Sequence, residues 1–198
     1  MTHLIALHVS NRACESSSLN PPFWKESRVP AYPLAGPEKL AQHHELDAFS
    51  CGVESLDQWL KRFARVNQQS DLTTTYVAHR NNRAVGYYSL TAGSINRADA
   101  TTRVAQGAPN QPIGVILLAR LAVDDSEKGT GLGRALLKDA LLRAASAADI
   151  IAVRAVLVHA LNEEARRFYM RFDFEPSPIH PLHLMLLMKD IRKSGWQH

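Results

Sequence analysis

One stretch of the chain decides the fold, and it reads Arg120-Leu121-Ala122-Val123-Asp124-Asp125-Ser126-Glu127-Lys128-Gly129-Thr130-Gly131-Leu132-Gly133-Arg134-Ala135. An apolar segment, 113–123, predicts a strand, and the leucine-rich segment that follows the glycines predicts a helix over about 131–147. Glycine permits positive φ and close approach to the backbone, and the first N–H groups of a helix have no internal partner. A strand, a glycine loop and a helix in this order therefore predict a phosphate site.

The spacing of the glycines excludes two common phosphate loops. A P-loop ends in Gly-Lys-Ser or Gly-Lys-Thr, whereas Gly133 is followed by Arg134 and Ala135. A dinucleotide fingerprint, Gly-x-Gly-x-x-Gly, would place its last glycine at Arg134 when counted from Gly129. The string follows Arg/Gln/Lys-x-x-Gly-x-Gly/Ala instead, from Lys128 to Gly133. For the loop alone, a glycine-rich turn without a ligand is the alternative.

This string, preceded by Leu121-Ala122-Val123, resembles the loop that binds the pyrophosphate of acetyl-CoA in the GNAT acetyltransferases. The resemblance implies that acetyl-CoA is the acetyl donor. It also implies a set of cofactor-binding residues, namely Leu121, Ala122, Val123, Lys128, Gly129, Thr130, Gly131, Leu132, Gly133, Arg134 and, further along the chain, Asn162.

Composition bounds the class of protein. The chain has 198 residues, of which 45% are hydrophobic, enough for one domain with a sizeable core. No apolar run approaches the roughly 20 residues of a membrane helix, and the first ten residues lack the basic start of a signal peptide. Two cysteines, Cys14 and Cys51, are too few for a disulfide framework, so we expect a cytoplasmic protein. A net charge of +4 hints at a polyanionic partner.

The hydrophobic pattern predicts an α+β fold. Residues 1–33, interrupted by Ser and Pro, suggest an irregular arm, 34–192 a single domain and 193–198 a tail. A helix after Cys51 is expected to bury Leu56, Trp59, Leu60 and Phe63. Strands are expected over 73–78, 84–91, 113–123, 151–159, 172–174 and 184–189, helices over 131–147 and 162–171, and a loop over 98–112. The order gives a mixed central β-sheet flanked by helices, as in the GNAT fold.

A second informative segment runs Asn162-Glu163-Glu164-Ala165-Arg166-Arg167-Phe168-Tyr169. Asn162 follows a strand, and a role as helix N-cap suffices to explain it. A helical tyrosine taken alone is more often a core residue than a catalyst. GNAT enzymes, however, place the tyrosine of such a segment beside the thioester sulfur, and the resemblance implies that Tyr169 is the general acid. A phenol of pKa about 10 stays protonated at neutral pH and can protonate a departing thiolate.

The strand 113–123 contains no carboxylate, although many acetyltransferases have a glutamate base there. Asp124 and Asp125 lie past the strand, where a solvated turn is the simpler interpretation. An α-amine has a pKa of about 7.7 to 8.0, against about 10.4 for lysine, so an aminoacyl-tRNA amine needs no strong base. We expect backbone N–H groups around Leu121–Val123, freed by a bulge or splay, to polarise the thioester carbonyl.

A segment ahead of the sheet narrows the resemblance. Phe49-Ser50-Cys51-Gly52, followed by Leu56-Asp57-Gln58-Trp59-Leu60, is similar to the opening of the TacT- and AtaT-like acetyltransferase toxins of type II toxin–antitoxin modules. That resemblance, over about 34–192, implies acetylation of aminoacyl-tRNA, a block of translation, a ribbon-helix-helix antitoxin and, as is common among such enzymes, a homodimer. An acetyltransferase of a small amine or a protein N-terminus, and a non-catalytic antitoxin-binding module, remain the alternatives.

Basic side chains suggest where tRNA would bind, and they are Lys61, Arg62, Arg65, Arg80, Arg83, Arg97 and Arg120. Four of them, Lys61, Arg62, Arg65 and Arg120, are taken as candidate site residues. For any single one, a solvated helix face is an equally good explanation. The pairs His43-His44 and His180/His183 raise the question of a metal site. No Cys or Glu cluster accompanies them in the sequence, so we expect no metal.

Overall fold

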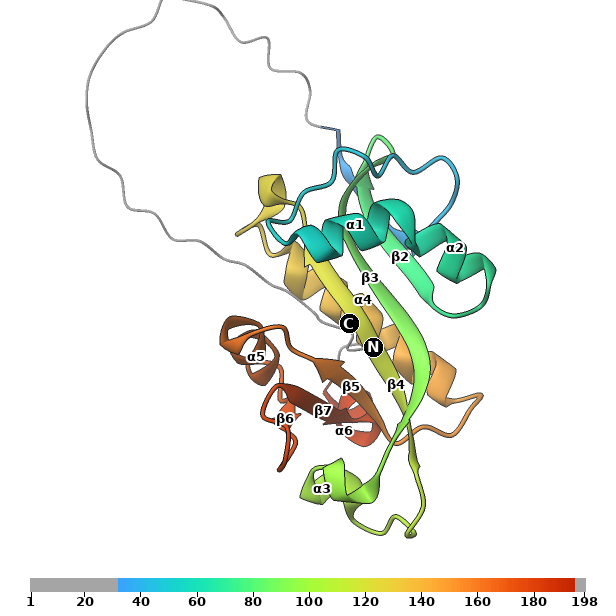
Figure 1. Ribbon diagram of the computed structural model, residues 1–198, viewed down its shortest axis with the longest axis vertical. Helices are drawn as coiled ribbons and strands as arrows, with labels where there is room; N and C mark the ends of the chain where they lie inside the picture. Colours follow the sequence, from blue (N-terminus) through green and yellow to red (C-terminus); the bar gives the residue numbers. More distant parts are fainter. Residues whose placement is uncertain (1–31, 195–198) are drawn as a thin grey trace, which may run out of the picture.

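The computed structural model describes residues 32–194, and it shows a mixed β-sheet with helices on both faces (Figure 1). The order of the strands in the sheet is β1-β2-β3-β4-β5-β7-β6. Their bounds are β1 Leu34–Lys39, β2 Thr74–Arg80, β3 Arg83–Ile95, β4 Ile113–Val123, β5 Ala155–His159, β6 Glu175–Pro176 and β7 His183–Leu187. Among the strands of the described residues, β4 and β5 are the pair that runs in parallel, and the helix between them provides the crossover that parallel strands need.

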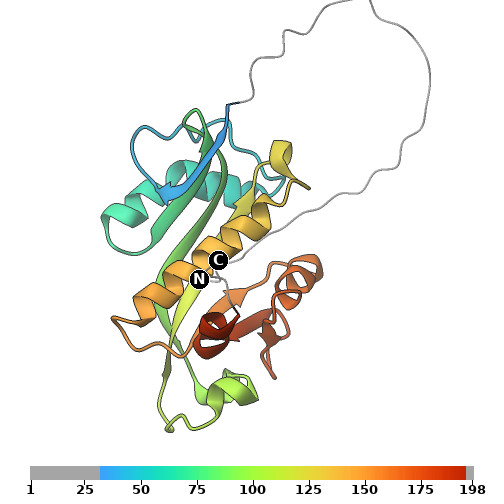
Figure 2. The same ribbon diagram turned by 180° about the vertical axis from the view of Figure 1, so that it is seen from behind.

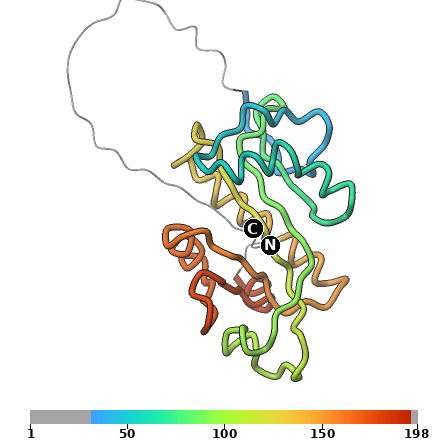
Figure 3. Tube along the Cα trace, viewed as in Figure 1, coloured from blue at the N-terminus to red at the C-terminus, as the bar shows by residue number. Residues whose placement is uncertain are grey.

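The helices divide between the two faces of the sheet. Their bounds are α1 Glu54–Arg62, α2 Ala64–Gln69, α3 Thr102–Ala105, α4 Leu132–Ala148, α5 Glu163–Met170 and α6 Met188–Lys193, with short 3-10 turns η1 Arg97–Asp99 and η2 Asp125–Glu127. α1 and α2 cover one face, and α4 covers the other (Figures 1 and 2). The N-terminal and C-terminal parts of the described chain lie on either side of the long β3–β4 ribbon (Figure 3). No described helix is long and apolar enough to span a membrane.

Alternation along β4 places its side chains in hydrophobic clusters on both faces of the sheet. Leu121 and Val123 pack in one cluster with the apolar side of α4, whereas Ala122 packs in another with Trp59 of α1 and Tyr87 of β3. Every one of these positions is less than a tenth exposed. β4 is therefore buried on both sides, which explains why its sequence is an almost continuous apolar run.

The α+β class, the strand 113–123 and the helix near 131–147 are confirmed. The predicted strand 172–174 is wrong, because Asp173 has φ +63° and the chain turns there before β6. The strand predicted over 184–189 ends at Leu187, and α6 follows it. β5 begins at Ala155, so the predicted strand 151–159 is too long at its start. The predicted loop 98–112 contains η1 and α3, and the sequence does not predict β1. The proposed arm 1–33 lies, apart from Tyr32 and Pro33, outside the described residues.

Phe63 is also predicted wrongly. The helical spacing predicts that it faces the core, yet Phe63 is 52% exposed. α1 ends at Arg62, and Phe63 has φ −115° as the junction between α1 and α2. Because α1 ends one residue before Phe63, the side chain of Phe63 does not continue the buried face of that helix. The next buried residue is Ala64 of α2.

Candidate active site

The edge between β4 and β5 opens part-way along β4. Leu118 pairs with Val158, and the described pairing of the two strands ends there, although β4 continues to Val123. On its other edge β4 carries a bulge, because Leu90 pairs with Leu118 while the preceding Ser89 pairs with Arg120. Ala119 is the extra residue. Nearly half of β4 thus has β3 on one side and no strand on the other, and the strand has both the bulge and the splay that were expected as alternatives.

The backbone of this open segment points into the gap. The N–H of Asp124 donates to the carbonyl of Val85 on β3, at 2.9 Å. Because backbone groups alternate along a strand, Ala122 also faces β3, and the N–H groups of Leu121 and Val123 face the opened edge. An unpaired N–H group on this edge can hold a carbonyl oxygen that gains negative charge. The other one, about 6.6 Å along the strand, can bind a different acceptor on the same ligand.

The glycine loop presents the start of α4 to the same region. Gly129 has φ +79° and Gly131 has φ +90°, a region that side chains with a Cβ rarely adopt. Gly131 is the N-cap of the 17-residue α4, and no side chain caps it. The first helical hydrogen bond found after the cap runs from the N–H of Ala135 to the carbonyl of Gly131, at 3.1 Å. The N–H groups of Leu132, Gly133 and Arg134 therefore have no partner within the helix, as an anion site needs.

The side chains of the loop take less part than its backbone. Lys128 turns away, since its Nζ donates to the carbonyl of Cys51 at 3.0 Å and pairs with Asp125 at 2.5 Å. Thr130 donates its hydroxyl to the carbonyl of Glu127 at 2.7 Å. Arg134 is exposed, and Leu132 is buried in the core. Lys128 and Thr130 thus hold the loop in shape, while Arg134 is free to reach an anion.

Tyr169 is wholly buried, and its hydroxyl has no hydrogen-bond partner among the described residues. Its ring packs between Phe174, with centroids 5.4 Å apart, and Phe168, at 5.2 Å. It belongs to the same apolar cluster as Leu121 and Val123. Burial raises the pKa of this phenol above its ordinary value of 10, so it stays protonated at neutral pH. A buried donor with nothing to bond is rare in a folded protein and is ready for a ligand atom.

Asn162 begins α5 and so positions Tyr169. Its Oδ1 accepts the N–H of Ala165 at 2.8 Å, which is the N-cap bond expected from the sequence. Its exposure is intermediate, so contact with a ligand is compatible with capping.

Comparison with known proteins gives this geometry a family. Residues 71–176 match the acetyltransferase (GNAT) domain. The chain is 49% identical to a tRNA-acetylating toxin of Mycobacterium tuberculosis (strain ATCC 25618 / H37Rv) over 158 residues, which are 80% of this chain and 95% of the relative. The chain belongs to the GNAT acetyltransferases.

Two solved structures show how closely this acetyltransferase follows its relatives. AtaT complexed with acetyl-methionyl-tRNAfMet matches with a TM-score of 0.75 and 26% identity, over 82% of this chain and 98% of that one. A mutant AtaT bound to the C-terminus of the antitoxin AtaR and acetyl-CoA matches with a TM-score of 0.67 and 26% identity, over 82% and 96%. The backbone opening and the glycine loop therefore lie in an acetyltransferase fold.

Asp124 of this acetyltransferase is not the solvated turn residue that the sequence suggested. It is 3% exposed, and its carboxylate accepts the N–H groups of Ser50 and Ser126, each at 3.0 Å. Arg83 lies 3.6 Å from it. Asp125 does match the prediction, with half of its side chain exposed. Asp124 therefore ties the segment before α1 to the end of β4, and its engaged carboxylate is poorly placed to act as a base.

The four basic candidates lie in different settings. Lys61 and Arg62 sit beside a pocket formed by α1, and Arg62 is exposed. Arg65 donates to the carbonyl of His44 at 2.5 Å. The guanidinium of Arg120 lies over the Trp59 indole, 4.0 Å from the ring centroid, and burial lowers its pKa. Arg65 and Arg120 thus have intramolecular contacts, which leaves Lys61 and Arg62 as the more available pair.

Glu38 is a neighbour of two histidines, which the sequence does not indicate. The ligand atoms of Glu38, His44 and His79 lie within 4.8 Å of one another, as in a metal site. However, Nδ1 of His44 accepts the N–H of Ala41 at 3.0 Å, and Nδ1 of His79 accepts the N–H of Asn82 at 3.2 Å. A neutral imidazole that accepts at Nδ1 carries its proton on Nε2 and has no lone pair left for a metal. Both Nε2 atoms lie near the Glu38 carboxylate, at 3.1 and 3.6 Å, and the exposed His43 hydrogen-bonds to it at 3.3 Å, so the cluster is a group of imidazoles around one carboxylate.

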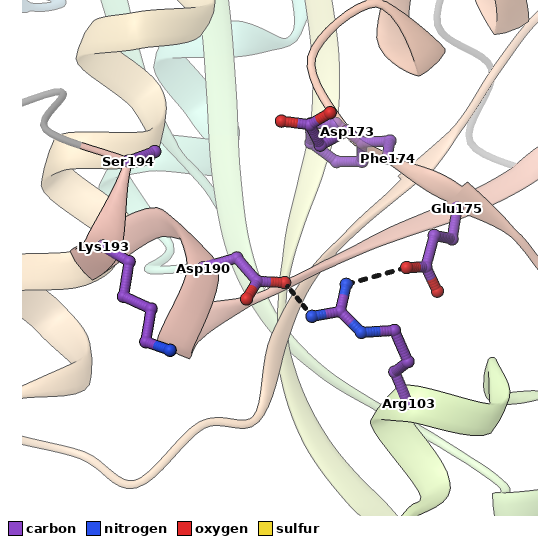
Figure 4. Close-up of a pocket in the computed structure, with 7 residues that line it drawn as sticks. All are labelled: Arg103, Asp173, Phe174, Glu175, Asp190, Lys193 and Ser194. Atoms are coloured by element: carbon purple, nitrogen blue, oxygen red, sulfur yellow. Dashed lines mark hydrogen bonds and ion pairs between the residues drawn. The ribbon is translucent and has the colours of Figure 1, made fainter.

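A separate pocket lies between α3, β6 and α6 (Figure 4). Arg103 crosses it and pairs with Glu175 at 2.8 Å and with Asp190 at 2.7 Å. The charges of Arg103, Glu175 and Asp190 are paired with one another. This arrangement is better suited to linking α3, β6 and α6 than to binding a ligand.

Proposed function

We propose that this acetyltransferase transfers the acetyl group of acetyl-CoA to the α-amine of an aminoacyl-tRNA and so blocks translation as a toxin. The 49% identity to a tRNA-acetylating toxin, over 95% of that protein, carries the choice of acceptor. The geometry of the open strand supports the chemistry. An acceptor with a largely neutral amine also agrees with a β4 that has no carboxylate.

Each part of the site has a role in this proposal. When bound, acetyl-CoA supplies an activated thioester. Its pyrophosphate is held by the N–H groups at the start of α4 and by the loop Lys128–Arg134, and Asn162 assists from α5. A backbone N–H group in the segment Leu121–Val123 polarises the carbonyl, and the hydroxyl of Tyr169 protonates the sulfur as it leaves.

The partners follow from the same relatives. The structure of mutant AtaT with the C-terminus of AtaR supports control by an antitoxin, for which we propose a ribbon-helix-helix protein. We further propose a cytoplasmic homodimer in which residues 34–192 form the catalytic domain. Lys61 and Arg62 contact tRNA phosphates, with Arg65 and Arg120 at the inner edge of that surface.

Incubation with labelled acetyl-CoA tests the acceptor directly. We expect label on the aminoacyl group of charged tRNA and none on the same tRNA after deacylation. Mass spectrometry of tRNA recovered after brief expression should show N-acetylated aminoacyl ends. Label that reaches small amines or protein N-termini but never charged tRNA would replace this proposal by a different acetyltransferase. Calorimetry without acetyl-CoA binding would instead indicate a non-catalytic, antitoxin-binding module.

A further inference from the structure

A group of histidines lies one residue beyond the point where β4 and β5 part. Leu117, Leu157 and Met185 form one row across β4, β5 and β7. His159 and His183 form the next row on the same face of β5 and β7, where β4 no longer pairs. Their imidazole rings stack with centroids 3.9 Å apart. The pair therefore stands at the edge of the gap into which the backbone of β4 points.

These histidines line a pocket of about 450 Å³. Its lining combines the apolar Leu117, Leu157 and Met185 with polar side chains, which include Asn96, Asp99 and His180. The ring of His180 lies 4.6 Å from that of His183. A pocket in which apolar side chains and several polar groups converge can hold a small ligand.

The pocket and Tyr169 lie on opposite faces of the sheet. Tyr169 packs in the cluster that contains α4, whereas Leu117, Leu157 and Met185 belong to a separate cluster. A group that protonates the leaving sulfur and a group that serves the incoming amine must approach the reacting carbon from different directions. Tyr169 and the histidines of the pocket, on opposite faces of the sheet, meet this requirement.

We propose that this pocket receives the aminoacyl end of the acceptor and that His183 takes the proton from its amine. The proposal rests on the proposed function and assigns the acceptor side of the same site. His159 is a positioning residue, whose ring holds that of His183 in place.

The protonation state of His183 fits this task. Burial lowers its pKa, and the nearby His180 lowers it further, while Asp99 acts in the opposite direction. The titratable groups that face it are thus His180 on the preceding turn, His159 on β5 and Asp99 on η1. A neutral imidazole at physiological pH is able to accept a proton.

The proton balance closes without a further reactant. The amine nitrogen bonds to the acetyl carbon, and the bond from that carbon to sulfur breaks. The nitrogen gives one proton to His183, and the sulfur takes one from Tyr169. Solvent then returns a proton from His183 to the tyrosinate, which leaves an amide, a CoA thiol and the starting enzyme.

The first test compares His183→Gln with His43→Gln in the full-length protein, at saturating acetyl-CoA with charged tRNA. His43 is exposed and lies in the Glu38 cluster, so its replacement is the matched control. We expect kcat of His183→Gln to fall by about 100-fold, the lower end of general-base effects, with the Kd for acetyl-CoA unchanged. An equal kcat for parent and His183→Gln would overturn the inference, and a parent that leaves charged tRNA unlabelled would overturn the proposed function itself.

The second test does not depend on the fold tolerating a change at His183. His180 is exposed, and His180→Gln removes the neighbouring charge. We expect the pKa of His183, followed by NMR of its imidazole, to rise by up to about half a unit, and the acid limb of the kcat profile to move by the same amount. An NMR titration that moves while the acid limb stays fixed would refute the role in proton transfer.

Discussion

Replacement of Tyr169 by Phe separates a catalytic hydroxyl from a structural one. The hydroxyl is buried and has no partner among the described residues, so its removal costs no hydrogen bond in the free protein. If it is the general acid, the same change removes proton donation to the sulfur. We therefore expect activity to fall while stability rises.

The magnitudes follow from this burial. A polar group buried without a partner costs about 1 to 3 kcal/mol. The Tyr169→Phe variant should accordingly gain at least about 1 kcal/mol in its free energy of unfolding, which corresponds to roughly 2 to 4 °C in melting temperature for a domain of this size. Loss of a general acid should lower the rate of acetyl transfer by about 10² to 10⁴.

Tyr87 provides the matched control. It is as buried as Tyr169, but its hydroxyl donates to the carbonyl of Leu56 at 2.9 Å. The same substitution, Tyr87→Phe, should therefore destabilise the protein by about 1 kcal/mol. Thermal melts and acetylation of charged tRNA are measured on both variants. We expect a higher melting temperature for Tyr169→Phe, a lower one for Tyr87→Phe, and a large loss of rate only for Tyr169→Phe. A lower melting temperature for Tyr169→Phe, or a rate equal to that of the parent, would refute this reasoning.

Three further outcomes are expected. In Gly131→Ala the added Cβ meets no atom within 4 Å, but an alanine at φ +90° costs about 1 to 2 kcal/mol of backbone strain. Calorimetry should therefore show weaker acetyl-CoA binding, and an unchanged Kd would contradict the role of this loop in binding. The double change Lys61→Glu and Arg62→Glu should weaken tRNA binding and reduce the slope of log K against log salt by about 2, with acetyl-CoA binding unaltered; an identical slope would remove both residues from the tRNA surface. Burial, and then the neighbouring His43 and His79, lower the pKa of His44. The unfolded chain therefore binds a proton first as pH falls below about 6.5, and stability is lost from there down to the folded pKa. Urea denaturation between pH 5 and 8 should show this loss in the parent and a flatter profile in His44→Gln, and parallel profiles would contradict it.

The parts of the site that rest on local sequence were predictable. The glycine loop, β4 and the N-cap at Asn162 each depend on residues within one turn or strand, and the structure has them where the spacing predicts. Positive φ at Gly131 follows from a chain that must turn from a strand into a helix within a few residues. Such features need no knowledge of the rest of the chain.

The features that the sequence did not reveal depend on distant contacts. Asp124 is buried because Ser50, 74 positions earlier, donates to it. The guanidinium of Arg120 lies over the ring of Trp59 on α1. The sequence suggested instead that this side chain contacts tRNA. The His159–His183 pair forms only when β5 and β7 are placed side by side. No periodicity within one segment indicates pairs of this kind.

Arg120 nevertheless marks the opening of the strand. Before the bulge, Ile116 and Leu118 face the cluster of α4, and after it Leu121 and Val123 do so. A regular strand would send residue 120 to that apolar side, where an unpaired guanidinium is very costly. The extra residue, Ala119, reverses the alternation and brings Arg120 to Trp59 instead. The bulge therefore allows the charged side chain of Arg120 to be buried in an apolar strand. The bulge lies at the point where the pairing of β4 with β5 ends. The charged Arg120 in this apolar strand therefore indicates where the strand opens, although the site at that opening is formed mainly by backbone groups.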